Sequence, residues 1–153
     1  MSDIPLIGPL LTRLLGPSRA RLAQEFLRFG VVGTAGFVVD TAVLYGALAL
    51  GAGLYGGRAL SYVTAATTTW LLNRVWTFRD RAGGQAVHRQ WALFVVVNLG
   101  GFVLNYGTYA ILVAFVPMVA AHPVLGVAAG SIAGMFSNFV LSRQLVFRPA
   151  PDR

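Results

Sequence analysis

The sequence predicts an all-α integral membrane protein, a four-helix bundle built from two related helical hairpins that enter the membrane the same way. Of its 153 residues, 56% are hydrophobic and only 11% are charged, and the mean hydropathy is +0.68. Soluble domains carry about a quarter charged residues, so this composition excludes an ordinary soluble fold. The length of the apolar stretches and a repeated motif define the individual helices.

The apolar stretches have the length of transmembrane helices. A helix needs about 20 residues to cross a hydrocarbon core roughly 30 Å thick. Four stretches qualify, at residues 26–50, 58–78, 91–116 and 123–147. The connections between them contain Gly or Pro, which favour turns, and the first stretch is too long for a cleaved signal sequence. We therefore expect a transmembrane domain over residues 25–148, a leader over 1–24 and a tail over 149–153.

The arginines predict the orientation of these helices. Every basic residue is Arg, and the net charge is +7. Basic residues near the ends of transmembrane helices stay on the cytoplasmic side. Only Arg58 lies on the opposite side, and the others are Arg13, Arg19, Arg21, Arg28, Arg74, Arg79, Arg81, Arg89, Arg143, Arg148 and Arg153. Both termini and the central loop are therefore expected to be cytoplasmic, in a multi-pass protein of the cytoplasmic membrane.

The excess of arginine also indicates an anionic partner. A nucleic-acid-binding domain would be comparably basic, but it would not contain four nearly uncharged helices. Membrane phospholipid or a phosphate-bearing lipid fits the composition better.

The leader leaves two interpretations open. Ile4, Ile7, Leu11 and Leu14 recur at helical spacing, which is typical of a helix lying on the inner leaflet. The prolines and glycines among them favour disorder or a loose strap equally well.

A short motif indicates an internal duplication. The pattern Leu-x-Arg-x-x-x-Phe-Arg begins at Leu72 and again at Leu141. The first and third helices also align, which places Asp40 opposite Asn105. Because each copy contains an even number of helices, the pseudo-symmetry axis is expected to run along the membrane normal.

Asp40 is the one acidic residue within a predicted transmembrane helix. A carboxylate at this depth costs about 2.5 to 3.5 kcal/mol on insertion scales, so it needs a polar partner or a water-filled cavity. Gly33 and Gly36 share its helix face, which allows another helix to approach closely. Asp40 could accept a ligand hydroxyl, act as a protonatable switch, or bond a neighbouring helix as a structural residue.

Four asparagines within or at the ends of the other helices are further candidates for substrate binding. They are Asn73, Asn98, Asn105 and Asn138. Amides donate and accept hydrogen bonds, so they suit sugar hydroxyls. They also link membrane helices to one another, at about 0.6 kcal/mol each, and both roles remain open. The glycines that precede Asn138 at intervals of four predict close helix packing.

Arg74 and Arg143 occupy the same position in the two copies of the motif. A guanidinium group binds phosphate oxygens in a two-pronged geometry. Arginines that only mark the cytoplasmic boundary would look the same. The recurrence makes both residues candidates for phosphate contact.

The chemistry of a metal site or an enzyme is missing from the sequence. There is no cysteine, and there are only two histidines, so we expect no metal and no cofactor. No phosphate-binding loop or nucleophile motif occurs. Acid–base catalysis uses positioned proton-transfer groups, and Asp40 has no second carboxylate beside it in the predicted helices unless Glu25 or Asp80 reaches in. We therefore expect that the protein is not an enzyme.

The motifs resemble those of a known family. Phe-Leu-Arg-Phe-Gly-Val-Val-Gly opens the first helix at residues 26–33, Asp40 and Ser61 follow, and Leu-Asn-Arg-Val-Trp-Thr-Phe closes the second at 72–78. This is similar to the GtrA-like family of small four-span membrane proteins, over about residues 25 to 148. The resemblance implies translocation of a polyprenyl-phosphate-linked sugar across the cytoplasmic membrane, for cell-surface polysaccharide synthesis.

The resemblance leaves alternatives. The chain could instead anchor a membrane glycosyltransferase without moving substrate. A small multidrug-type exporter is a third possibility, although those bind cations with Glu rather than Asp. Because four helices enclose little volume, we expect a homodimer, or a groove open to lipid.

Overall fold

The computed structural model describes residues 7–149, and all the regular secondary structure in this range is helical. The all-α prediction is therefore confirmed. The chain forms two compact units, Met1–Asp80 and Arg81–Arg153. The first contains α1 (Gly8–Leu15), α2 (Pro17–Ala49), α3 (Leu54–Leu72) and the π-helical turn η1 (Asn73–Thr77). The short 3-10 turn η2 (Arg79–Arg81) follows, and the second unit contains α4 (Val87–Phe115), α5 (Pro117–Ala121), α6 (Pro123–Leu141) and the π-helical turn η3 (Ser142–Val146).

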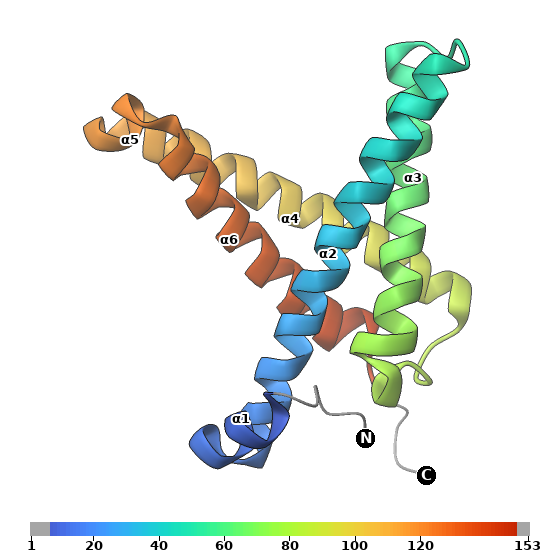
Figure 1. Cartoon of the computed structure of the whole chain (residues 1–153), viewed down its shortest axis with the longest axis vertical. Coiled ribbons are helices and arrows are strands. Elements are labelled where there is room, and N and C mark those ends of the chain that lie inside the picture. The colour runs from blue at the N-terminus through green and yellow to red at the C-terminus, as the bar shows by residue number, and fades with distance from the viewer. Residues whose placement is uncertain (1–6, 150–153) are drawn as a thin grey trace. The chain divides into compact units, whose positions relative to one another are not determined.

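The first unit is a hairpin in which α2 and α3 run side by side in opposite directions (Figure 1). Gly51 in the connecting turn has φ 85, a backbone conformation that favours glycine. Farther along the pair, Gly36 lies against the methyl group of Thr69. The missing side chain at Gly36 is what allows the two helices to pack closely there.

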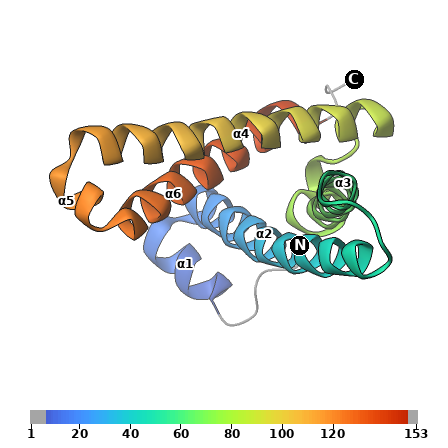
Figure 2. The same ribbon diagram turned by 90° about the horizontal axis from the view of Figure 1, so that it is seen from above.

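The second unit repeats this arrangement with α4 and α6, which lie side by side in both ribbon views (Figures 1 and 2). The connection between them, at residues 117–122, contains the short helix α5. Pro117 stands at the start of α5, where its missing N–H costs no hydrogen bond.

The leader contains a helix, which favours its interpretation as a helix lying on the inner leaflet. Its expected start at residues 4–6 lies outside the described residues, and α1 begins at Gly8 with a proline in its first turn. Gly8 is buried, whereas Leu10 and Leu14 are 56% and 69% exposed. The helix packs against α2 and presents leucines on its other face, as an interfacial helix would.

The predicted duplication is visible in the backbone. Each copy of the motif forms a five-residue π-helical turn directly after a 19-residue helix. The N–H of Phe78 donates to the carbonyl of Asn73, and the N–H of Phe147 donates to that of Ser142, both at 2.8 Å. Such turns are rare and occur often at functional sites, so their recurrence at the same motif position supports a common origin of the two units.

The aromatic core of each unit repeats as well. Phe78 lies 6.1 Å from Phe29, and Phe147 lies 6.2 Å from Phe94, measured between ring centroids. Phe94 follows Phe29 by 65 positions and Phe147 follows Phe78 by 69. These two offsets define equivalent positions in the two units.

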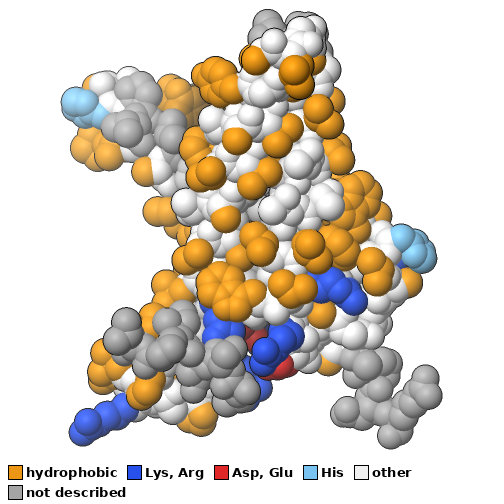
Figure 3. Space-filling model, turned by 45° about the vertical axis from the view of Figure 1, so that its right-hand side comes forward, with side chains coloured by type: hydrophobic (Ala, Val, Ile, Leu, Met, Phe, Trp, Pro, Cys, Tyr) orange, Lys and Arg blue, Asp and Glu red, His pale blue; other side chains and the backbone are white. Residues whose placement is uncertain are grey.

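The outer surface of the helices is largely apolar. Leu50, Phe37 and Phe115 are 91%, 70% and 79% exposed, and Figure 3 shows apolar side chains along α2 and α3. Within the described residues, α2 and α4 are long and apolar enough to cross a membrane, and only 17% and 11% of their apolar windows are buried. A core helix of a soluble protein would be mostly buried. Membrane crossing by α3 and α6, and the cytoplasmic orientation, stay predictions.

Candidate functional site

The two π-helical turns carry buried polar side chains next to arginines. Asn73 is 2% exposed and Ser142 is 0% exposed. Asn73 Oδ1 and Ser142 Oγ have no hydrogen-bond partner among the described residues. Buried polar atoms are usually paired, so these two atoms mark positions where a ligand or water could bind.

Arg74 and Arg143 directly follow these two residues and are half-buried. The guanidinium of Arg74 lies 5.9 Å from the ring centre of Trp70, a distance at which a cation is attracted to an indole face. The structure therefore places the two predicted arginines at equivalent positions, each beside a buried polar residue of its own unit.

Asp40 does not lie at the same position along the hairpin as Asn73 and Arg74. Gly36 lies opposite Thr69, and α2 and α3 are antiparallel. Asp40 is one helical turn beyond Gly36 in one direction, and Asn73 is one turn beyond Thr69 in the other. The rise of an α-helix then separates Asp40 from Asn73 by roughly 12 Å along the hairpin. Asp40 is half-buried on α2.

The three asparagines of the second unit lie in different surroundings. Asn98 Nδ2 donates to the carbonyl of Phe94, one turn earlier in α4, at 2.8 Å. Asn105 Nδ2 contacts Ser131 Oγ of α6 at 3.5 Å. The side chain of Asn138 lies against Gly101, and its Oδ1 is buried with no hydrogen-bond partner in the part of the chain described. Asn105 and Asn138 thus share the α4–α6 contact, whereas the amide donor of Asn98 bonds its own helix.

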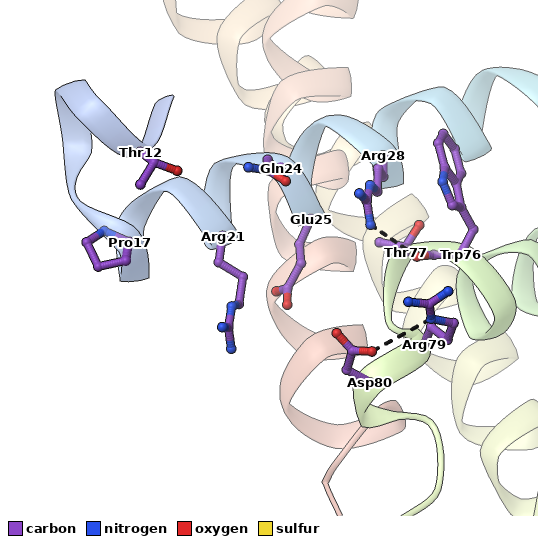
Figure 4. Close-up of a pocket in the computed structure, with 10 residues that line it drawn as sticks. All are labelled: Thr12, Pro17, Arg21, Gln24, Glu25, Arg28, Trp76, Thr77, Arg79 and Asp80. Atoms are coloured by element: carbon purple, nitrogen blue, oxygen red, sulfur yellow. Dashed lines mark hydrogen bonds and ion pairs between the residues drawn. The ribbon is translucent and has the colours of Figure 1, made fainter. Parts of the chain in front are cut away.

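A polar pocket that the sequence analysis did not predict lies within the first unit. It has a volume of about 210 Å³ and is formed by α1, the beginning of α2 and the segment from η1 to η2 (Figure 4). Three arginines and two carboxylates line it, together with Trp76 and Thr77; the charged residues are Arg21, Glu25, Arg28, Arg79 and Asp80.

The side chains that line the pocket come from two segments of the chain, residues 12–28 and 76–80. Arg21, Glu25 and Arg28 project from successive turns of α2 toward the segment that follows α3 (Figure 4). Arg28 donates from Nη1 to the carbonyl of Trp76 at 3.5 Å, and its guanidinium lies 5.8 Å from the centre of the Trp76 ring. Arg79 Nε lies 3.7 Å from Asp80 Oδ1. Thr77 is 4% exposed, and its hydroxyl has no hydrogen-bond partner among residues 7–149.

Sequence reasoning missed this pocket because its arginines were interpreted only as markers of the cytoplasmic side. The residues come from two segments about fifty positions apart, and only the α2–α3 hairpin and the fold of α1 bring them together. One signal was available in the sequence. Arg21, Glu25 and Arg28 follow each other at helical spacing, which places three charged groups on one face before the apolar stretch begins.

Two hairpins of exposed apolar helices, with charged side chains gathered at the end of one, define a helical membrane protein. Residues 28–147 match the family described as "GtrA/DPMS, transmembrane domain", and the chain belongs to this family. The resemblance seen in the sequence is thereby confirmed. None of the curated proteins compared with the chain matches it significantly. Membership indicates a role in glycosyl-lipid related processes, in a family of generally non-catalytic membrane proteins.

Proposed function

We propose that the protein moves a polyprenyl-phosphate-linked sugar across the cytoplasmic membrane, for synthesis of a cell-surface polysaccharide. The family match over residues 28–147 carries this proposal. In it, four helices cross the membrane, with both termini and the central loop in the cytoplasm. The exposed apolar surfaces of α2 and α4 support contact with lipid, which is where the prenyl chain would remain.

In this proposal, the arginines of the π-helical turns bind phosphate. Arg74 and Arg143 are half-buried at equivalent positions. A partly desolvated guanidinium forms stronger hydrogen bonds to phosphate than an exposed one. Asn73 and Ser142 directly precede these arginines, and their buried polar atoms support binding of a polar ligand beside each arginine.

The sugar would be bound deeper in the membrane. Asp40 in the first unit, and separately Asn105 and Asn138 in the second, each offer hydrogen-bonding groups to sugar hydroxyls, and the unpartnered Oδ1 of Asn138 supports this role for the second unit. We assign no contact to Asn98, because its amide donor bonds Phe94. Two helices per unit enclose little space, so we propose that the working form is a homodimer.

One observation favours a second candidate, a non-transporting subunit that anchors a glycosyltransferase. Asn105 of α4 bonds Ser131 of α6, as expected of a residue that only holds helices together. In this case the substrate would belong entirely to the partner enzyme.

Transport in reconstituted vesicles separates the two candidates. The assay follows a fluorescent polyprenyl-phosphate sugar from the inner to the outer leaflet, with wild type beside Arg74→Ala, Arg143→Ala and Asp40→Asn. Loss of a charged hydrogen bond in the transition state should slow transport about tenfold or more. Arg148→Ala is the matched control, because Arg148 is exposed and donates from Nε to the carbonyl of Gln144, four residues earlier. A wild-type rate equal to that of empty vesicles would overturn transport and favour the anchor.

A further inference from the structure

The charged residues of the pocket are only partly repeated in the second unit, where Arg79 corresponds to Arg148 but Arg28 corresponds to Leu93. We propose that this pocket, formed by α1, the beginning of α2 and η1, binds the phosphate and the adjoining hydroxyls of a lipid-linked sugar before it crosses. The inference rests on the proposed function and extends it, since it assigns the entry site to one unit and to residues other than Arg74 and Arg143.

The duplication provides an internal control for what the fold requires. With the offsets defined by the aromatic pairs, Arg28 corresponds to Leu93, Trp76 to Leu145 and Thr77 to Val146. Val146 is fully buried, so an apolar side chain fills this position of the hairpin. The polar side chains of Arg28 and Thr77 are therefore not needed to form a hairpin of this kind.

The same comparison applies to the acidic residue. Glu25 corresponds to Gln90, which is fully buried and donates from Nε2 to the carbonyl of Ala82 at 3.2 Å. The second unit thus has a neutral amide at the position where the first unit has a carboxylate. Burying a charge costs more than burying an amide, which points to a role for Glu25 beyond packing.

The chemistry of the pocket suits a phosphate joined to a hydroxylated group. The guanidinium groups of Arg21, Arg28 and Arg79 can each donate two parallel N–H hydrogen bonds to phosphate oxygens. Glu25 and Asp80 accept hydrogen bonds from hydroxyls, and a site with three arginines against two carboxylates keeps a net positive charge. The buried hydroxyl of Thr77, which has no partner within the described residues, offers a further donor or acceptor.

The surroundings of the pocket favour an amphiphile over a free sugar phosphate. Leu14 of α1 and Leu27 of α2 are 69% and 44% exposed, and they belong to the helices that line it. In Figure 3 the charged side chains gather next to an apolar surface that continues along α2 and α3. A ligand with a charged head and an apolar chain can use both surfaces at once.

Binding of radiolabelled farnesyl phosphate to the full chain in phosphatidylcholine nanodiscs tests the proposal. The double variant Arg28→Leu/Thr77→Val carries the residues that stand at the equivalent positions of the second unit. Loss of charged and neutral hydrogen bonds should raise the Kd about tenfold or more. Arg19→Leu removes the same charge from an exposed position of α2 that does not line the pocket, and its Kd should stay within about twofold of wild type.

Farnesol and phosphatidylglycerol distinguish the possible ligands. Farnesol lacks the phosphate and should bind at least about tenfold more weakly. An unchanged Kd in the double variant, equal affinity for farnesol, or displacement by an equal concentration of phosphatidylglycerol would each overturn the proposal. The thermal unfolding midpoint of the double variant, expected to match wild type, shows that a raised Kd reflects the site rather than misfolding.

The vesicle assay separates failure of this inference from failure of the proposed function. If the double variant loses binding while wild type moves no lipid-linked sugar, the site stands and transport is overturned. If wild type transports and the double variant binds normally, transport stands and this site is overturned.

Discussion

The side chain of Asn138 lies directly against Gly101, so that a β-carbon at this glycine would overlap the amide. The equivalent pair in the first unit, Gly36 and Thr69, makes the same kind of contact. Each hairpin therefore has a close helix contact at a glycine facing a polar side chain. Close approach at small residues is how membrane helices gain packing energy, so this contact contributes to the packing of both hairpins.

We predict that Gly101→Ala lowers the stability of the α4–α6 hairpin. The new methyl group must displace the Asn138 amide, and overpacking of this kind costs about 1 to 3 kcal/mol. The thermal unfolding midpoint in detergent should fall. The neighbouring Gly100→Ala is the control, because a β-carbon there meets nothing within 4 Å, and its midpoint should not fall. Equal midpoints for the two variants would show that the hairpin is not packed at Gly101.

The aromatic pair after each π-helical turn gives a second stability prediction. Phe147 is fully buried against Phe94, whereas Phe102 on the same hairpin is 67% exposed. Phe147→Ala should cost about 3 to 5 kcal/mol, because it leaves a cavity in the core. Phe102→Ala removes a ring of the same size from the surface and should change the unfolding free energy far less. Denaturant unfolding in detergent measures both, and equal losses would contradict the assignment of the core.

Much of the helical architecture could be predicted because its causes are local in sequence. The apolar length of each stretch and the Gly or Pro after it were enough to place the helices, and the expected end at residue 78 lies one position beyond η1. Only the start of the first helix differs much, because α2 continues back to Pro17 through a charged segment. Hydropathy does not detect a helix that extends beyond the apolar core.

The candidate site could be predicted only in part because it depends on tertiary contacts. The repeated motif correctly paired Arg74 with Arg143, since equivalent positions are visible in an alignment. Helical spacing could not show that Asp40 and Asn73 lie on opposite sides of the Gly36 contact. Nor could it show that α1 folds back against α2 and completes a pocket beside Arg28, because that contact joins segments with no common pattern.

The hydrogen bonds of two asparagines predict different effects on transport. Asn98→Ala removes an amide whose donor bonds Phe94, and we expect a transport rate within about twofold of wild type. Asn138→Ala removes the buried Oδ1 that has no partner among the described residues, and we expect a rate about tenfold lower. The vesicle assay measures both variants, and unfolding midpoints serve as the folding control. A larger loss for Asn98→Ala would reverse the two assignments.

The absence of cysteine allows a direct test of orientation. Wild type carries no thiol, so a single introduced cysteine reports one position without background. Gly53 and Gly83 are exposed, and a β-carbon at either meets nothing within 4 Å, so both should accept the substitution. Because the arginines predict a cytoplasmic central loop, a membrane-impermeant maleimide should label Gly53→Cys in intact cells and Gly83→Cys only after permeabilisation. Labelling of both in intact cells, or the opposite pattern, would refute the predicted topology and, with it, a cytoplasmic entry site beside Arg28.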